Sequence, residues 1–135
     1  MKMNTSFTED EQKLEKLMKL IEQEEGLSEI TENEILAHFE LRGEKAVKIL
    51  KENRLHKLLL SKNLFLWEVE GKSKNYLIIN STFCECRDFQ IRVLGREEKS
   101  ICYHLLAKII GEKLKLYDSR KLSEIEYEKI LESRI

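Results

Sequence analysis

The stretch FCECRDFQIRVLGREEKSICYHLLA, residues 83–107, decides how the rest of the chain is interpreted. Cys84-Glu85-Cys86 lies near its start, and Cys102-Tyr103-His104 follows after 15 intervening residues. All three cysteines of the chain fall in these two motifs. Unrelated core thiols are the alternative, since free cysteine is often buried. Chance, however, does not readily place every cysteine in two Cys-x-(Cys/His) pairs around one loop.

The spacing of both motifs suits a single metal ion. Side chains two apart in an extended chain point the same way, so Cys84 and Cys86 can face one ion. The side chains of residues two apart in a regular helix point in nearly opposite directions. We therefore expect Cys102 to lie just before a helix or in its distorted first turn, with His104 one step into the helix. Zinc accepts thiolate and imidazole ligands tetrahedrally. Three thiolates and one imidazole leave no position for a water nucleophile, which predicts one structural Zn²⁺.

The pattern C-x-C-(x15)-C-x-H resembles the SWIM zinc finger, whose defining motif is CxCx(n)CxH. The resemblance covers residues 64–113, including the Trp67 strand, the run that follows Gly71, and the aromatic Phe89 after the first ligand pair. Arg87 departs from it, since many family members carry a small residue or proline there. The segment from Phe89 to Leu94 and the small size are most similar to the SWIM subunit of the Shu complex and its archaeal relatives.

That resemblance implies a non-enzymatic accessory protein of homologous recombination and DNA repair. It would act with a RecA/RadA-family recombinase or a paralogue, with DNA contact and a homodimer as further options. The alternative function is a stand-alone zinc-finger module that binds nucleic acid or another protein. Partner surfaces are sought on two apolar helix stripes, formed by Leu14, Leu17 and Leu20 and by Ile125, Ile130 and Leu131.

The regions outside the finger predict an α+β fold. Residues 1–62 are expected to be a helical amino-terminal region, 63–115 the finger with its β-hairpin, and 116–135 a carboxy-terminal helix, all within one compact domain. Capping-box spacing at Thr8 predicts a helix over residues 9–24, with Gly26 after it. A second capping signature at Thr31 predicts a helix that stops near Gly43. A third helix from Ala46 runs into the leucines of residues 55–60, and its end is not fixed by the pattern.

The middle of the chain reads as β-structure. Residues 64–69 and 76–83 are rich in branched and aromatic side chains around a Gly-containing turn, which predicts a hairpin. Alternation at Phe89, Ile91 and Val93 predicts a third short strand. An amphipathic helix from about Ile101 to Gly111 and a final helix opened at Ser123 complete the expected elements.

Charge is unevenly distributed. Residues 1–40 carry 11 acidic and 4 basic residues, a net of −7, whereas residues 41–74 carry 9 basic and 4 acidic residues, a net of +5. A basic stripe recurs every three residues and is a candidate for phosphate contacts: Lys45, Lys48, Lys51, Arg54 and Lys57. A solvated helix face is the simpler interpretation. Trp67 and Tyr76 are candidates for stacking on nucleobases, although packing on the zinc-site helix is favoured.

No catalytic residues are expected. The chain has no nucleotide-binding glycine loop, and zinc would consume both Cys102 and His104 as a nucleophile–base pair. His38 and His56 lie far from the motifs in sequence and are expected to be surface or helix-face histidines. An odd number of cysteines, with neither signal peptide nor membrane-spanning run, predicts a location inside the cell. That would be the cytoplasm of a prokaryote, with a thermophilic source suggested by composition and an archaeal one by the resemblance, or the nucleus of a eukaryote.

Overall fold

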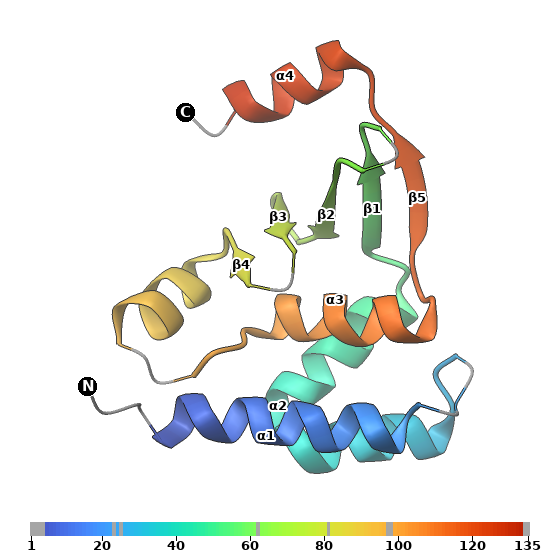
Figure 1. The fold of residues 1–135 in the computed structure, drawn as a ribbon, viewed down its shortest axis with the longest axis vertical. Helices are drawn as coiled ribbons and strands as arrows, with labels where there is room; N and C mark the ends of the chain where they lie inside the picture. Colours follow the sequence, from blue (N-terminus) through green and yellow to red (C-terminus); the bar gives the residue numbers. More distant parts are fainter. Residues whose placement is uncertain are drawn as a thin grey trace.

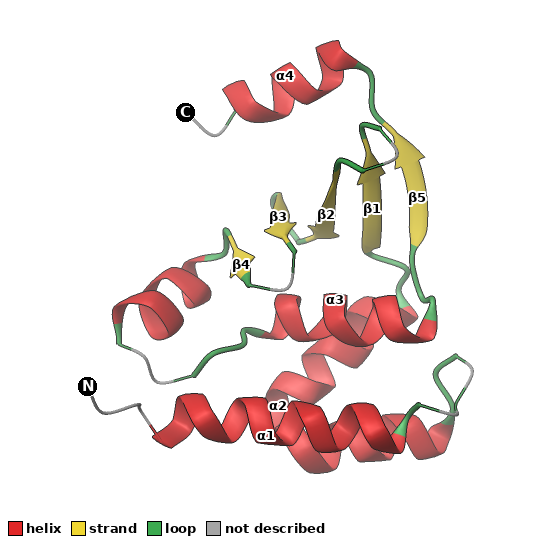
Figure 2. Ribbon diagram, in the orientation of Figure 1, coloured by secondary structure: helices red, strands yellow, loops and turns green. Residues whose placement is uncertain are grey.

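The computed structural model describes residues 5–22, 24, 26–61, 63–80, 82–96 and 99–133, and it confirms the α+β class. Helices α1 and α2 lie side by side at one end of the molecule (Figure 1). Helix α3 lies between them and a five-stranded sheet, and α4 lies at the opposite end, beyond the sheet (Figure 2). Among the described residues, no helix combines the length and apolar character needed to cross a membrane.

Helix α1 covers Thr5–Leu20, which corrects both ends of the prediction. The helix begins before the capping signature at Thr8 and ends six residues before Gly26. Asp10, which lies within this signature, is buried against the protein. Leu17 of this helix and Ile21, directly after it, enter the main core, so one face of the helix packs against the rest of the protein.

The span α2, Glu29–Lys51, consists of two helical segments that meet at a sharp kink, which agrees with the two helices predicted over this part of the chain. It is capped by Ser28, whose Oγ accepts a hydrogen bond from the Thr31 amide at 3.1 Å, so the predicted start at Thr31 is three residues late. The bend lies at Glu40, with φ 51° and ψ −122°, close to the predicted stop at Gly43. Only glycine suits position 43, because a Cβ there would approach the Ile35 carbonyl oxygen to 2.6 Å.

The sheet has the strand order β4-β3-β2-β1-β5, with all neighbours antiparallel except β1 and β5. The predicted hairpin is confirmed as β2 and β3, in which Trp67 pairs with Ile78. The strands are β1 Leu55–Leu59, β2 Phe65–Glu70, β3 Asn75–Ile79, β4 Phe83–Cys84 and β5 Asp118–Lys121.

Two of these strands correct the sequence analysis. The leucine-rich run 55–60 is not a helical extension, because Leu55–Leu59 is strand β1, which pairs with β2 across the boundary expected at residue 62. A continuous apolar run does not distinguish a buried helix from a strand. Strand β5 was not predicted at all, since its four residues are exposed and charged or polar.

The two faces of the sheet bury different apolar clusters. One face packs on α3, and its side chains join the main core through Leu55, Trp67, Val69 and Ile78. The other face carries the small cluster of Leu58, Leu77 and Leu122, against which Ile130 of α4 packs. Helix α4, Glu124–Glu132, begins with the predicted cap, a reciprocal capping box between Ser123 and Glu126. It has no buried residue, so it covers that face thinly.

The segment after Cys86 is a helix and not the predicted third strand. Phe89–Gly95 forms a π-helix, η1, in which Phe89 and Val93 are buried while Ile91 is 40% exposed. Buried residues four apart match a helical turn, and the alternating pattern read from the sequence is therefore misleading. Helix α3, Tyr103–Leu114, confirms the predicted amphipathic helix and begins directly after Cys102.

Candidate metal centre

The first ligand pair is placed by the end of strand β4. Cys84 pairs with Ile78 of β3, and Glu85 continues the contact because its amide donates to the Leu77 carbonyl at 3.1 Å. The Glu85 carboxylate in turn accepts the Leu77 amide at 2.9 Å. This reciprocal contact fixes extended backbone between the two cysteines, and Cys84 and Cys86 are both buried.

The second ligand pair is placed by the start of helix α3. Cys102 is the N-cap residue, in extended conformation, and its Sγ accepts the Leu105 amide at 3.4 Å. His104 lies two residues on, inside the first turn, and both side chains are buried. The expected arrangement, with Cys102 just before the helix and His104 one step inside, is confirmed.

The four side chains form a single cluster that can hold one metal ion. One ligand atom from each of Cys84, Cys86, Cys102 and His104 lies within 4.8 Å of all the others. Exposed fractions are 0%, 3%, 0% and 4%, so the cluster is sealed from solvent. With metal–sulfur distances of about 2.3 Å, neighbouring ligands of a tetrahedral ion lie roughly 3.8 Å apart, which this cluster accommodates.

The polar environment of the cluster fits a cation. Amide groups of Phe89 and Leu105 donate to the sulfurs of Cys86 and Cys102 at 3.3 and 3.4 Å, which stabilises negative charge on sulfur. The Nδ1 atom of His104 is buried with no hydrogen-bond partner among the described residues. An unpartnered buried nitrogen is costly in a protein interior, whereas coordination of an ion gives the imidazole a role there.

The three cysteine thiols differ in the direction in which their pKa values are shifted. Hydrogen bonds from Cys102 and Cys84 hold the pKa of Cys86 far below its ordinary value. The hydrogen bond to Cys102, together with that to Cys86 and burial, raises the pKa of Cys84 far above its ordinary value. Contact with Cys84 lowers the pKa of Cys102, but contact with Cys86, burial and the Cys86 charge outweigh it and raise this pKa to about 12. A cation that binds all three sulfurs must therefore displace protons.

Two tyrosines flank the histidine of the cluster. The His104 ring lies 4.0 Å from the ring of Tyr103 and 4.7 Å from that of Tyr76, both tilted. Tyr76 is thus engaged on the ligand and half-buried. Trp67 is fully buried with its ring 4.9 Å from that of Tyr117, so it is inaccessible to a nucleobase. Packing, the favoured interpretation of both aromatic residues, is what the structure shows.

The chain matches no protein-family model, and neither curated proteins nor solved structures give a significant match.

The predicted basic stripe is divided between elements. Lys45, Lys48 and Lys51 lie on α2, whereas Arg54 follows the helix and Lys57 lies on β1. Lys45 and Lys48 are exposed. Four members contact other side chains of the protein: Lys51 pairs with Glu32 at 2.6 Å, Arg54 pairs with Glu52 at 3.0 Å, and the ammonium groups of Lys45 and Lys57 lie 5.1 and 4.2 Å from the ring centres of Tyr103 and Phe65. The five residues therefore do not form one uniform face.

The two remaining histidines lie outside the cluster. His38 contacts the Glu34 carbonyl at 2.8 Å within α2. His56 is more than a surface residue, because its ring bridges Asp118 of β5 and Glu70 of β2, the latter at 2.7 Å. Burial lowers the pKa of His56, but the hydrogen bonds and charges of Asp118 and Glu70 outweigh it and raise this pKa above 6.5. Sequence analysis missed this bridge because its members are 14 and 62 residues apart from His56.

The raised pKa of His56 predicts a pH-dependent contribution to stability. The protonated ring binds both carboxylates, so its contribution is complete below pH 6.5 and is lost as the pH rises through the raised value. We expect His56→Gln to lower the free energy of unfolding of the metal-loaded protein at pH 6 by about 1 kcal/mol or less, since the site is partly solvent-screened. At pH 9 the difference should be smaller. Urea unfolding at both pH values measures it, and a difference that grows with pH would contradict the assignment.

Proposed function

We propose that the cluster binds one structural zinc ion and that the protein is a non-enzymatic accessory factor. The observation that carries the proposal is a buried set of three thiols and one imidazole that joins the sheet edge to helix α3. Three sulfurs and one nitrogen suit zinc, which is borderline soft and prefers four ligands in structural sites. Because the four ligands complete the tetrahedral shell, zinc would crosslink the fold rather than activate water.

The placement of the ligands supports the SWIM resemblance. One pair comes from the end of a hairpin and the other from the start of a helix, and both meet in the core rather than in a surface loop. From this resemblance we propose a role in homologous recombination and DNA repair, with a RecA/RadA-family recombinase or paralogue as partner. A stand-alone module, binding nucleic acid or another protein, is the alternative.

Helix α4 offers the better partner surface of the two stripes considered. Leu17 of α1 is fully buried, so the α1 stripe serves the protein's own core. On α4, Ile125 is 65% exposed and Leu131 is 45% exposed, whereas Ile130 packs against the sheet. Exposed apolar side chains beside a thinly covered sheet face are a feature of protein-interaction sites. Direct DNA contact receives less support, because four of the five predicted basic residues contact other side chains of the protein.

The association can be tested by light scattering of this protein mixed with the recombinase paralogue of its own source. We expect Ile125→Glu to weaken the complex about 10-fold or more, as loss of a central apolar contact does. Ile30→Glu is the matched control, since Ile30 is 66% exposed but lies on α2. Both variants should keep one zinc per chain.

Three results would contradict the proposal in different ways. Absence of association between the wild type and any recombinase-family protein would remove the recombination role and favour the stand-alone module. Equal weakening by both variants would remove the α4 surface. Wild-type protein without stoichiometric metal would remove the zinc site.

A further inference from the structure

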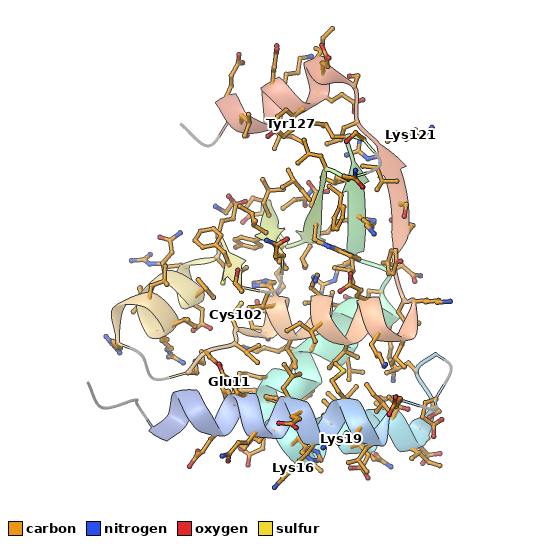
Figure 3. All side chains as sticks on the ribbon, viewed as in Figure 1. Glu11, Lys16, Lys19, Cys102, Lys121 and Tyr127 are labelled. Carbon is orange, nitrogen blue, oxygen red and sulfur yellow. The ribbon has the colours of Figure 1, made fainter. Side chains whose placement is uncertain are left out.

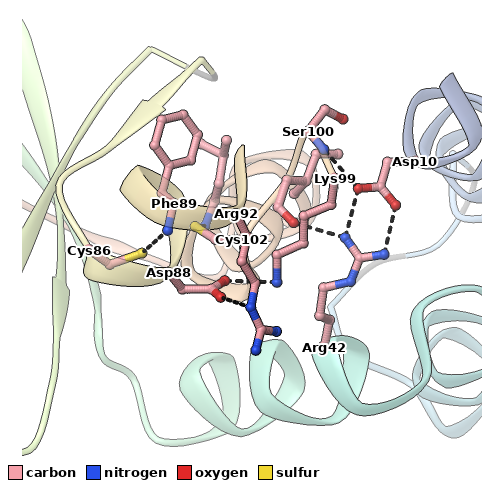
Figure 4. Close-up of polar contacts among 11 residues, drawn as sticks. Asp10, Arg42, Cys86, Asp88, Phe89, Arg92, Lys99, Ser100 and Cys102 are labelled. Atoms are coloured by element: carbon pink, nitrogen blue, oxygen red, sulfur yellow. Dashed lines mark hydrogen bonds and ion pairs between the residues drawn. The ribbon is translucent and has the colours of Figure 1, made fainter. Parts of the chain in front are cut away.

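The segment between the two ligand pairs, residues 87–101, is held near each end by polar contacts of a carboxylate, Asp88 at its start and Asp10 at its end (Figure 4). Asp88, two residues after Cys86, pairs with Lys99 at 2.8 Å and with Arg92 at 3.5 Å. These contacts are local, because all of their members lie between the ligand pairs. The second set of contacts is different, since it reaches the segment from helices α1 and α2.

Asp10 of α1 is the centre of the second set of contacts. Its carboxylate receives both terminal nitrogens of Arg42, at 2.6 and 2.8 Å. Oδ2 also accepts the Ser100 amide at 3.0 Å, and Arg42 Nη1 donates to the Ile101 carbonyl at 2.8 Å. Asp10 is only 3% exposed while the Arg42 side chain is 22% exposed, so these bonds are partly buried, and those that involve a charged group belong to the strong class. Asp10 thereby contacts residues 32 and 90 positions away in the sequence, Arg42 and Ser100.

The bonds end on the backbone directly before the second ligand pair. Ile101 is covalently joined to Cys102, and residues 99–101 belong to no helix or strand. Two of the four bonds, those of Ser100 and Ile101, therefore set where this extended segment enters α3. Cys102 must be extended at that point for its sulfur to face the cluster, as it is with φ −84° and ψ 168°.

We infer that Asp10 and Arg42 are positioning residues for the metal centre, so that docking of α1 and retention of the metal depend on each other. The inference rests on the metal site proposed above and adds that its second ligand pair is held from outside the finger. An ordinary buried ion pair would hold α1 without regard to the metal. The contacts on Ser100 and Ile101 link the two, since the Asp10–Arg42 pair joins α1 and α2 to the segment that leads into Cys102.

The first test uses variants of the full, zinc-loaded chain. Zinc release to a chromogenic chelator should be about 10- to 100-fold faster in Asp10→Asn, the range found when groups that support metal ligands are removed. Glu15→Gln, which removes a charge from an exposed pair on the same helix, should release zinc at the wild-type rate. Leu122→Ala, in the cluster on the far sheet face, controls for general loss of stability. Equal release by Asp10→Asn and by Leu122→Ala, at equal loss of melting temperature, would overturn the inference.

The second test needs no variant, so no substitution disturbs the fold, and it is read under conditions in which the zinc-free chain stays folded. Coupling is reciprocal, so removal of zinc from the wild type should speed amide hydrogen exchange in α1. Helix α4, on the far side of the sheet, should exchange as before. An unchanged α1, or an equal increase in α4, would overturn the coupling while leaving the metal site intact. A wild-type chain that binds no zinc would overturn the site itself, and the coupling with it.

Discussion

Cys86→Ser and Cys102→Ser should each bring the zinc content well below one per chain and lower the free energy of unfolding by about 4 kcal/mol or more. The reason is the burial of the cluster, since each cysteine residue is at most 3% exposed. A hydroxyl is a poor zinc ligand, and without the ion the remaining thiols and the unpartnered His104 nitrogen stay in the core with less compensation. Elemental analysis and urea unfolding measure the two effects.

His38→Ala is the matched histidine control for His104→Ala. Within the described part of the chain, both polar contacts of the His38 ring are with Glu34. Its Nδ1 lies 2.8 Å from the Glu34 carbonyl oxygen and 3.9 Å from the Glu34 carboxylate. Its loss should cost about 0.5 kcal/mol or less and leave zinc content unchanged. His56 is not a neutral control, because it bridges two strands. Equal effects of His38→Ala and His104→Ala would refute the ligand assignment.

The ligand cluster could be predicted because its information is local. Cys84 and Cys86 are two positions apart at a strand end, so their side chains point to the same side. The start of a helix places Cys102 and His104, and no contact with distant residues is needed to predict it. Helix α4 was predictable for the same reason, since its capping box lies within Ser123 to Glu126. The hairpin of β2 and β3 followed from two apolar runs and the turn between them.

What could not be predicted depends on contacts between distant segments. Strand β1 is apolar at most positions, and only its pairing with β2 and β5 makes it a strand rather than the end of a helix. Strand β5 carries no apolar residue and exists through parallel pairing with β1. The Asp10–Arg42 pair spans 32 residues, and a single sequence offers no signal that a carboxylate in an apparent helix cap is buried.

Burial differs sharply between side chains of helix α1, including two leucines that the sequence pattern treats alike. Cys102 lies between the layers, whereas Lys16 and Lys19 project from the outer side of α1 (Figure 3). On the same helix Leu17 is 0% exposed and Leu20 is 53% exposed. Periodicity placed both leucines on one partner-binding stripe. The structure divides them, because the helix ends at Leu20 and only the residues that face α2 enter the core.

Leu17→Ala should therefore lower the free energy of unfolding by about 2–5 kcal/mol, the cost of truncating a leucine in a packed core. Leu20→Ala, the same substitution three residues later, should change it by about 0.5 kcal/mol or less. Urea unfolding of the zinc-loaded proteins compares them, with the slope of the transition checked for equality. Equal losses would mean that α1 does not dock on α2 as described.

The same pair of leucines decides whether α1 can also serve a partner. Leu17→Glu would place a charge in the core and unfold α1, so lost association in that variant would carry no information about a binding surface. Leu20→Glu keeps the core intact and changes only the exposed end of the helix. If partner binding uses α4, Leu20→Glu should bind the recombinase as the wild type does, while Ile125→Glu does not. Loss of binding in Leu20→Glu, with unfolding and zinc content unchanged, would move the partner surface to α1.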